Sequence, residues 1–145
     1  MKLKFYSVLA SVFILSFLNI NNLAAQGFHS VSSKLLLDTS TTWNGDNITY
    51  PEGIAKITAL KIEIEPGAET GWHHHPVSSF AYILQGELEI TLMDGRKMTA
   101  SAGEAVAEVT NTIHNGKNIG HETLKLIVFY TGIEGGTLTI LKDSD

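Results

Sequence analysis

Two stretches of the chain decide its interpretation. Residues 67–86 read GAETGWHHHPVSSFAYILQG, and residues 103–118 read GEAVAEVTNTIHNGKN. The first stretch contains three consecutive histidines, His73, His74 and His75. Side chains two residues apart on a β-strand point to the same face, so we expect His73 and His75 to lie together and His74 to face the opposite way. Two imidazoles on one face favour a divalent transition metal such as Mn, Fe, Zn, Ni or Cu.

The second stretch offers a third metal ligand. Two histidines rarely hold a metal ion alone, and His114 comes just after a predicted strand. We therefore predict a metal site made of His73, His75 and His114. Two other interpretations stay open: His73 and His75 as surface histidines of a polar loop before Pro76, and His114 as a structural histidine bonded to the backbone.

The chain after residue 26 has the pattern of an all-β domain. Strands are expected where short apolar or alternating segments occur, at residues 34–37, 54–64, 80–84, 87–92, 105–109, 124–131 and 137–141. Asp94-Gly95 predicts a hairpin turn. In the segment 54–64, the residues expected to share one face are Ile54, Leu60, Ile62 and Ile64. No segment has a sustained helical period, but periodicity alone does not choose between a jelly roll, an immunoglobulin-like sandwich and a lipocalin-type barrel.

Composition narrows the classes of protein and of site. A chain of 145 residues has room for one domain. It has no cysteine, which excludes disulfides, thiolate metal sites and iron–sulfur clusters. Ten basic against fifteen acidic residues give a net charge of −5, so we expect no nucleic-acid partner.

Residues 1–25 have the three parts of a secretory signal. Lys2 and Lys4 are followed by an apolar run over residues 5–18, and Ala24-Ala25 offers small residues for cleavage. The run of 14 residues is shorter than the roughly 20 that span a membrane. We expect export to the periplasm or the medium with no stable membrane insertion, and a domain over residues 26–145; an uncleaved N-terminal anchor is the alternative.

The two stretches together resemble the cupin family. The first cupin motif is matched by Gly67, His73, His75 and Gly86, and the second by Gly103, His114 and Asn118. The resemblance implies a single-domain cupin barrel, a jelly-roll-like double-stranded β-helix, with motif one at 67–86 and motif two at 103–118. It also implies very varied chemistry, because cupins include dioxygenases, isomerases, sugar-binding proteins and storage proteins.

Three residues depart from the cupin motifs. Ser79 occupies the position of the Glu that cupins use as a fourth metal ligand, and Val109 and Asn111 replace the Pro and Gly of motif two. Glu108 lies six residues before His114, where it could reach the same cavity. Three roles stay open for Glu108: a direct metal ligand, a proton-transfer group beside the metal, or a solvated acid at a strand end.

Three functions are compatible with these residues. The first is a small metal-dependent enzyme acting on a small organic molecule by oxygen activation, isomerisation or hydrolysis. The second is a non-catalytic module that binds a small molecule or sugar, and the third is a structural protein with a vestigial site. The family resemblance also implies a homodimer, in which residues 31–37 could serve as an exchanged strand.

Export makes a direct prediction about the mature chain. Because the predicted signal ends at Ala25, the exported protein should begin at or near Gln26. Intact-mass measurement of the protein recovered outside the cytoplasm should show the loss of residues 1–25. A full-length chain embedded in the membrane would contradict this prediction.

Overall fold

The computed structural model describes residues 31–143, so the predicted signal at 1–25 lies outside the described residues. The chain divides into two units, Met1–Lys34 and Leu35–Asp145, and the strands found among the described residues all belong to the second. Between residues 31 and 143 no helix offers the length and apolarity that crossing a membrane requires.

Nine strands make up the regular structure of the described residues. They are β1 (Ala55–Ile64), β2 (His73–His74), β3 (Ser78–Gln85), β4 (Glu87–Leu92), β5 (Lys97–Ser101), β6 (Ala105–Ala107), β7 (His114–Asn118), β8 (Leu124–Ile133) and β9 (Ile140–Leu141). The all-β prediction is confirmed.

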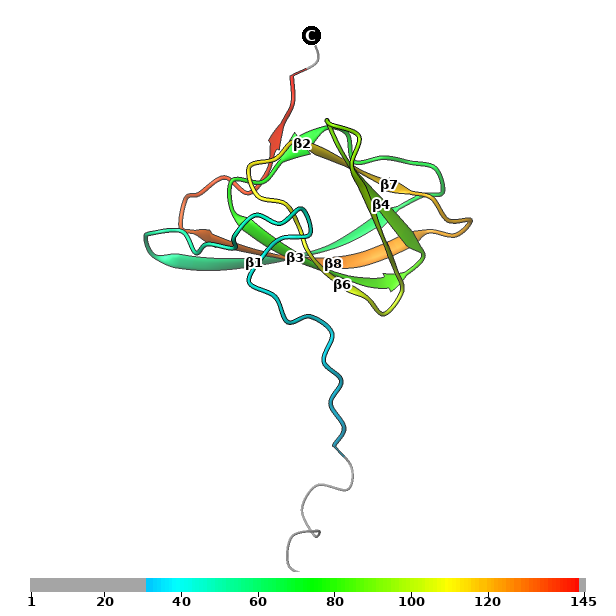
Figure 1. Cartoon of the computed structure of the whole chain (residues 1–145), viewed down its shortest axis with the longest axis horizontal. Coiled ribbons are helices and arrows are strands. Elements are labelled where there is room, and N and C mark those ends of the chain that lie inside the picture. The colour runs from blue at the N-terminus through cyan, green and yellow to red at the C-terminus, as the bar shows by residue number, and fades with distance from the viewer. Residues whose placement is uncertain (1–30, 144–145) are drawn as a thin grey trace, which may run out of the picture. The chain divides into compact units, whose positions relative to one another are not determined.

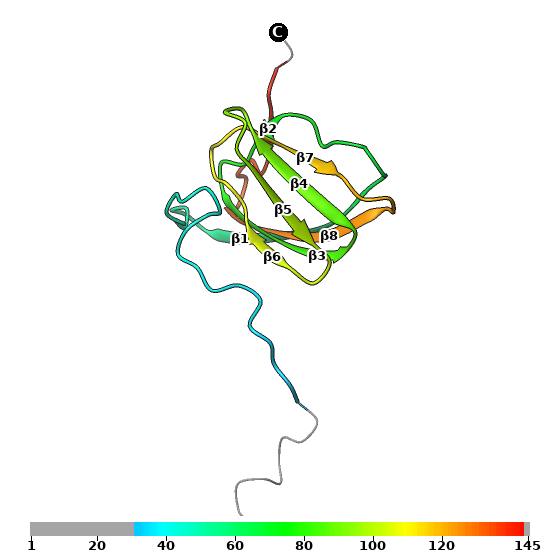
Figure 2. The same cartoon turned by 45° about the vertical axis from the view of Figure 1, so that its right-hand side comes forward.

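The strands form two antiparallel sheets. One sheet has the order β1-β8-β3-β6 and the other has the order β5-β4-β7-β2-β9. Strands of the two sheets lie above and below one another in Figure 1, and the turned view in Figure 2 brings β5 into sight beside β4. Neighbours in each sheet are often distant in sequence, because the chain crosses repeatedly from one sheet to the other.

The core lies between the inner faces of the two sheets. On β8, Leu126, Val128 and Tyr130 are buried while Phe129 between them is exposed, which is the period-two alternation of a strand with one buried face. Ile83 and Ile90 are almost fully buried and belong to the same apolar cluster, one from each sheet. Burial of these side chains is the main stabilising contribution in a domain without cross-links.

Most predicted strands are present, with corrected ends. The strand predicted at 105–109 ends at Ala107, and the one predicted at 137–141 is reduced to Ile140–Leu141. The strand predicted at 34–37 was wrong: these residues have no regular structure and are exposed, Leu35 by 76%. An apolar run forms a strand only where a partner supplies hydrogen bonds, and no strand of the described residues pairs with this segment.

The predicted face of the segment 54–64 is correct only toward its end. Ile62 and Ile64 face the core, but Ile54 and Leu60 are exposed. Ile54 precedes β1, and the burial along β1 rises only toward its end, with Ile62 half-buried and Ile64 buried, so the core covers the strand only there. The apolar periodicity predicted which side chains share one face of the strand. It did not predict how far along the strand the core covers that face.

Two turns connect β3 to β4 and β4 to β5. Gly86 and Gly95 have φ values of 85° and 86°, in the left-handed region that disfavours residues with a Cβ. The predicted Asp94-Gly95 hairpin is confirmed, with the Gly95 amide donating to the Leu92 carbonyl at 3.0 Å. The turns differ in their surroundings: a Cβ on Gly86 would lie 3.0 Å from the Leu124 Cα, whereas one on Gly95 would meet nothing within 4 Å.

This difference predicts unequal costs for the same substitution. Gly95→Ala should lower the free energy of unfolding by about 1–2 kcal/mol, because only the left-handed backbone opposes the methyl group. Gly86→Ala should cost at least about 1 kcal/mol more, because its methyl group also displaces the backbone of β8. Urea unfolding of both variants measures the difference, and equal losses would contradict the packing described for Gly86.

Candidate functional site

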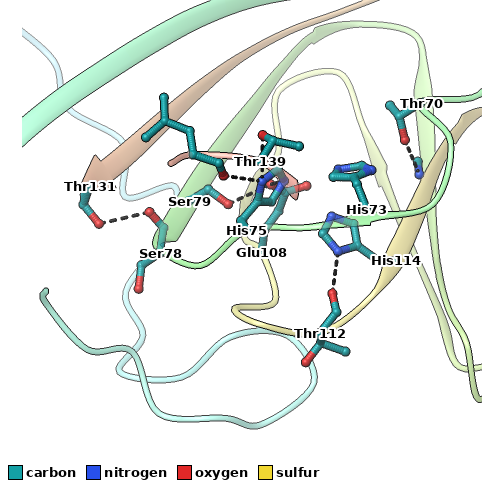
Figure 3. Close-up of polar contacts among 12 residues, drawn as sticks. Thr70, His73, His75, Ser78, Ser79, Glu108, Thr112, His114, Thr131 and Thr139 are labelled. Atoms are coloured by element: carbon teal, nitrogen blue, oxygen red, sulfur yellow. Dashed lines mark hydrogen bonds and ion pairs between the residues drawn. The ribbon is translucent and has the colours of Figure 1, made fainter. Parts of the chain in front are cut away.

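The three predicted metal ligands meet between β2 and β7. His73 on β2 is directly opposite His114 on β7 in the antiparallel register, and His75 follows β2. The ring centroids are 4.4 Å apart for His73 and His114, 4.8 Å for His73 and His75, and 5.1 Å for His75 and His114. Figure 3 shows the three rings side by side. All three are buried, whereas His74 is half-buried and outside the group, as the strand alternation predicts.

Each of the three rings is held by a backbone carbonyl. The Nδ1 atoms lie at hydrogen-bond distance from carbonyl oxygens, at 2.7 Å for His73 and Gly71, 2.9 Å for His75 and Leu138, and 2.8 Å for His114 and Thr112. Because a carbonyl can only accept, each Nδ1 must carry the proton. The Nε2 atom of each neutral ring is then left with a free lone pair.

These lone pairs suit a metal ion. One ligand atom from each histidine lies within 4.8 Å of the others. The His114 Nε2 is buried and has no hydrogen-bond partner among the described residues. A buried polar atom without a partner costs free energy, and a cation bound among the three nitrogens would satisfy it. The three histidines could therefore hold a metal ion, and their donor atoms fit one.

Burial also favours the uncharged form of two of these histidines. It lowers the pKa of His75 and of His114, since a charged imidazolium is poorly solvated there. The negative charge of Glu108 and the hydrogen bonds to the backbone oppose this shift. A metal competes with protons for the same nitrogen, so the lowered pKa leaves both rings available for metal binding at neutral pH.

Glu108 reaches the histidine cluster from the other sheet, where it directly follows β6, the strand paired with β3. Ser79 is buried on β3 and its hydroxyl donates to the Glu108 Oε2 at 2.8 Å, drawn as a dashed line in Figure 3. The Glu108 amide also donates to the Ser79 carbonyl at 3.0 Å, which continues the β3–β6 ladder. The Glu108 Oε2 lies 3.7 Å from the His75 Nε2. The carboxylate missing at position 79 is thus present directly across the strand pair.

The second motif keeps its geometry despite its substitutions. Asn111, which replaces a glycine, has a φ of 53°, and Asn tolerates this left-handed conformation better than most residues. Its amide donates to the His75 carbonyl at 2.8 Å, which ties the second motif to the first. Asn118 is fully buried and its side-chain amide donates to two backbone carbonyls, so it is a structural residue here. His121 is exposed in a loop, and His29 lies outside the described residues.

Sequence reasoning missed Tyr130 as a residue of the site. Its ring centroid is 5.1 Å from that of His75, and it lines the same cavity. Burial, together with the charge of Glu108, raises the pKa of Tyr130 to about 12, against a hydrogen bond with Thr139, so the hydroxyl remains protonated. The alternation of Leu126, Val128 and Tyr130 on one face was the signal that could have placed it.

Comparisons with known proteins give the fold family. A model of the cupin domain matches residues 60–130. An uncharacterised protein with a double-stranded β-helix domain from Klebsiella pneumoniae is 18% identical, with a TM-score of 0.52 over 67% of this chain and 91% of that one. No curated protein sequence matches this chain.

Two solved enzymes share the fold over part of their length. An oxalate decarboxylase from Bacillus subtilis with Mn(II) centres is 24% identical, with a TM-score of 0.51 over 59% of this chain and 23% of that one. A DMSP lyase from Ruegeria pomeroyi is 20% identical, with a TM-score of 0.51 over 59% of this chain and 43% of that one. The matches therefore span less than half of each enzyme, and they establish the fold alone.

The cupin-domain model matches residues 60–130, and the structure resembles a solved protein with a double-stranded β-helix domain. Both findings support placing this chain in the cupin superfamily, whose all-β fold it has.

Proposed function

We propose that this protein is an exported cupin that binds a divalent transition metal through the Nε2 atoms of His73, His75 and His114. The observation that carries the proposal is the convergence of three buried imidazoles whose Nδ1 atoms are all occupied by carbonyls. Nitrogen donors of this type suit Mn, Fe, Zn, Ni or Cu. The named Mn(II) centres of the structurally similar oxalate decarboxylase make Mn the first metal to test.

Glu108 is the proposed acidic partner of the metal. Its Oε2 is fixed by Ser79 on one side and faces the His75 Nε2 on the other. From there the carboxylate either becomes a fourth ligand or accepts and returns a proton at the bound ligand. A divalent metal at three neutral histidines supplies Lewis acidity toward a bound oxygen atom. Tyr130, protonated and lining the same cavity, can donate a hydrogen bond to that ligand.

The activity proposed is that of a small metal-dependent enzyme acting on a small organic molecule. A cavity adjoins the histidines, and a buried carboxylate and a tyrosine hydroxyl line it. A site used only for binding does not require a buried acid, whose desolvation costs free energy. The structurally similar oxalate decarboxylase and DMSP lyase are named as enzymes. A non-catalytic binding protein would hold the metal and the ligand without turnover, and product formation separates the two.

Export and self-association complete the proposal. Residues 1–25 support delivery to the periplasm or the medium, because they have the order of a cleaved signal. A homodimer is supported by the exposed side chains of Ile57 and Phe129 on β1 and β8, which lie on the outer face of one sheet. Light scattering on the protein that begins near Gln26 tests it, and a monomer would contradict it.

The metal site predicts a clear order among four histidine variants. Replacing His73, His75 or His114 with Ala should lower bound metal by about tenfold or more, because two histidines rarely suffice. His74→Ala is the matched control and should retain the metal, because its ring is outside the group. Elemental analysis of untagged protein from its native host measures all four. Equal loss from His74→Ala would show that the site is elsewhere.

Variants of Glu108 and Ser79 separate the two roles of the carboxylate. If Glu108 is a ligand, Glu108→Gln should weaken metal binding by about tenfold; if it transfers a proton, the variant should retain the metal and lose turnover. If Glu108 is a ligand, Ser79→Glu should crowd the site and weaken metal binding, because it places a second carboxylate within hydrogen-bond distance of Glu108; if Glu108 is not a ligand, Ser79→Glu should add an anionic ligand and tighten metal binding. Metal affinity at fixed pH is the measurement. Unchanged metal affinity in both variants would exclude Glu108 as a ligand and would show that the side chain at position 79 does not face the metal.

A further inference from the structure

The cavity beside the histidines has walls of two chemical kinds. Its polar lining comes from the three histidines, Glu108, Thr70 and Tyr130. The remaining side chains that line it are aliphatic and come from both sheets: Ile62, Ile64, Leu88, Ile90, Leu126 and Val128. Most of the enclosed surface therefore offers no hydrogen-bond partner to a bound molecule.

The polar and the aliphatic side chains that line the cavity lie at different positions along the strands. Going back along the inner face of β8, the order is Tyr130, Val128 and Leu126, so this wall changes from polar to apolar. On the opposite sheet His114 pairs with Leu92 at one end of β7, and Leu88 pairs with Asn118 at the other. Apart from Thr70, whose hydroxyl accepts a hydrogen bond from the Gly116 amide at 2.9 Å, the polar groups gather near the metal ligands, and the aliphatic ones extend away from them.

In the described part of the chain, the cavity lining contains an acidic side chain but no Lys or Arg. Among the cavity-lining residues of the described chain there is no Lys or Arg, and the acidic group is Glu108, which is buried. A bound molecule with one anionic group can place it at the metal. A second anionic group would lie against aliphatic side chains with no counter-charge, at a high desolvation cost.

The size of the cavity limits the ligand further. Its volume is about 40 Å³. A water molecule needs roughly 10–15 Å³ on this measure, so the space holds on the order of three waters. A short chain fits this space with less displacement of the walls than a sugar ring would require.

From these observations we propose that the substrate is a small molecule with one metal-binding donor group, such as a carboxylate or enolate oxygen, and a short hydrocarbon end. The walls select against sugars, phosphorylated compounds and dicarboxylates. This inference rests on the proposed metal site, since the donor group is held there, and it adds the class of molecule that the aliphatic walls accept.

Short acids that differ in one end group test the inference. Protein loaded with Co(II) is titrated with butyrate, with 3-hydroxypropionate, which has a hydroxyl in place of the terminal methyl, and with succinate, which has a second carboxylate. The change in the Co(II) d–d absorption reports binding without turnover. Butyrate should bind about tenfold more tightly than 3-hydroxypropionate, whose hydroxyl would be buried unpaired, and succinate more weakly still.

A cavity-filling variant tests where the hydrocarbon end lies. Gly116 lines the cavity, and an added Cβ would lie 3.4 Å from Leu88 Cδ1 and from Thr70 Cγ2. Gly116→Ala should retain Co(II), lower the affinity for butyrate about fivefold to tenfold, and leave acetate, which has no chain to place there, little changed.

The possible results separate the two proposals. Co(II) uptake with 3-hydroxypropionate or succinate binding as tightly as butyrate would overturn the substrate class and leave the metal site intact. An unchanged butyrate affinity in Gly116→Ala would overturn the placement of the hydrocarbon end. A protein that takes up no Co(II) would overturn the metal site and this inference together.

Discussion

The candidate site depends on the pairing of β2 with β7. This contact places His73 directly opposite His114, and β2 itself is only two residues long. So short a strand is held by its neighbours, with β7 on one side and β9 on the other. The bond from the Asn111 amide to the His75 carbonyl adds a further tie between the two motifs. Without this pairing, histidines about 40 positions apart in the sequence would not share one face of a sheet.

The rings are oriented by two different kinds of contact. His73 and His114 each bond the carbonyl two residues earlier, so the local backbone fixes both rings. His75 instead bonds the Leu138 carbonyl, which comes from the segment leading into β9, and its Nδ1 also lies 3.1 Å from the Thr139 hydroxyl. Its orientation therefore depends on the end of the chain folding back against β2. Two of the three rings are oriented by their local backbone, and the third is oriented only once the sheet is complete.

The difference between local contacts and contacts that need the complete sheet also explains what could be predicted from the sequence. The alternation of His73, His74 and His75, the strands around them and the Asp94-Gly95 turn are local features, and the structure agrees with each. The strand expected at 34–37 failed because a strand needs a partner that no local pattern reveals. The roles of Leu138 and Thr139 could not be predicted for the same reason, since neither lies near a histidine in sequence.

Glu108 brings a carboxylate next to Ser79, which stands where the cupin motif has its Glu. Ser79 on β3 is paired with Glu108, which directly follows β6, and the Glu108 side chain lines the cavity. The Ser79 hydroxyl, however, occupies one lone pair of the Glu108 Oε2. A carboxylate held by such a hydrogen bond is less free to move toward a metal. Ser79 thus holds Glu108 with its Oε2 3.7 Å from the His75 Nε2, and both roles proposed for the carboxylate start from this position.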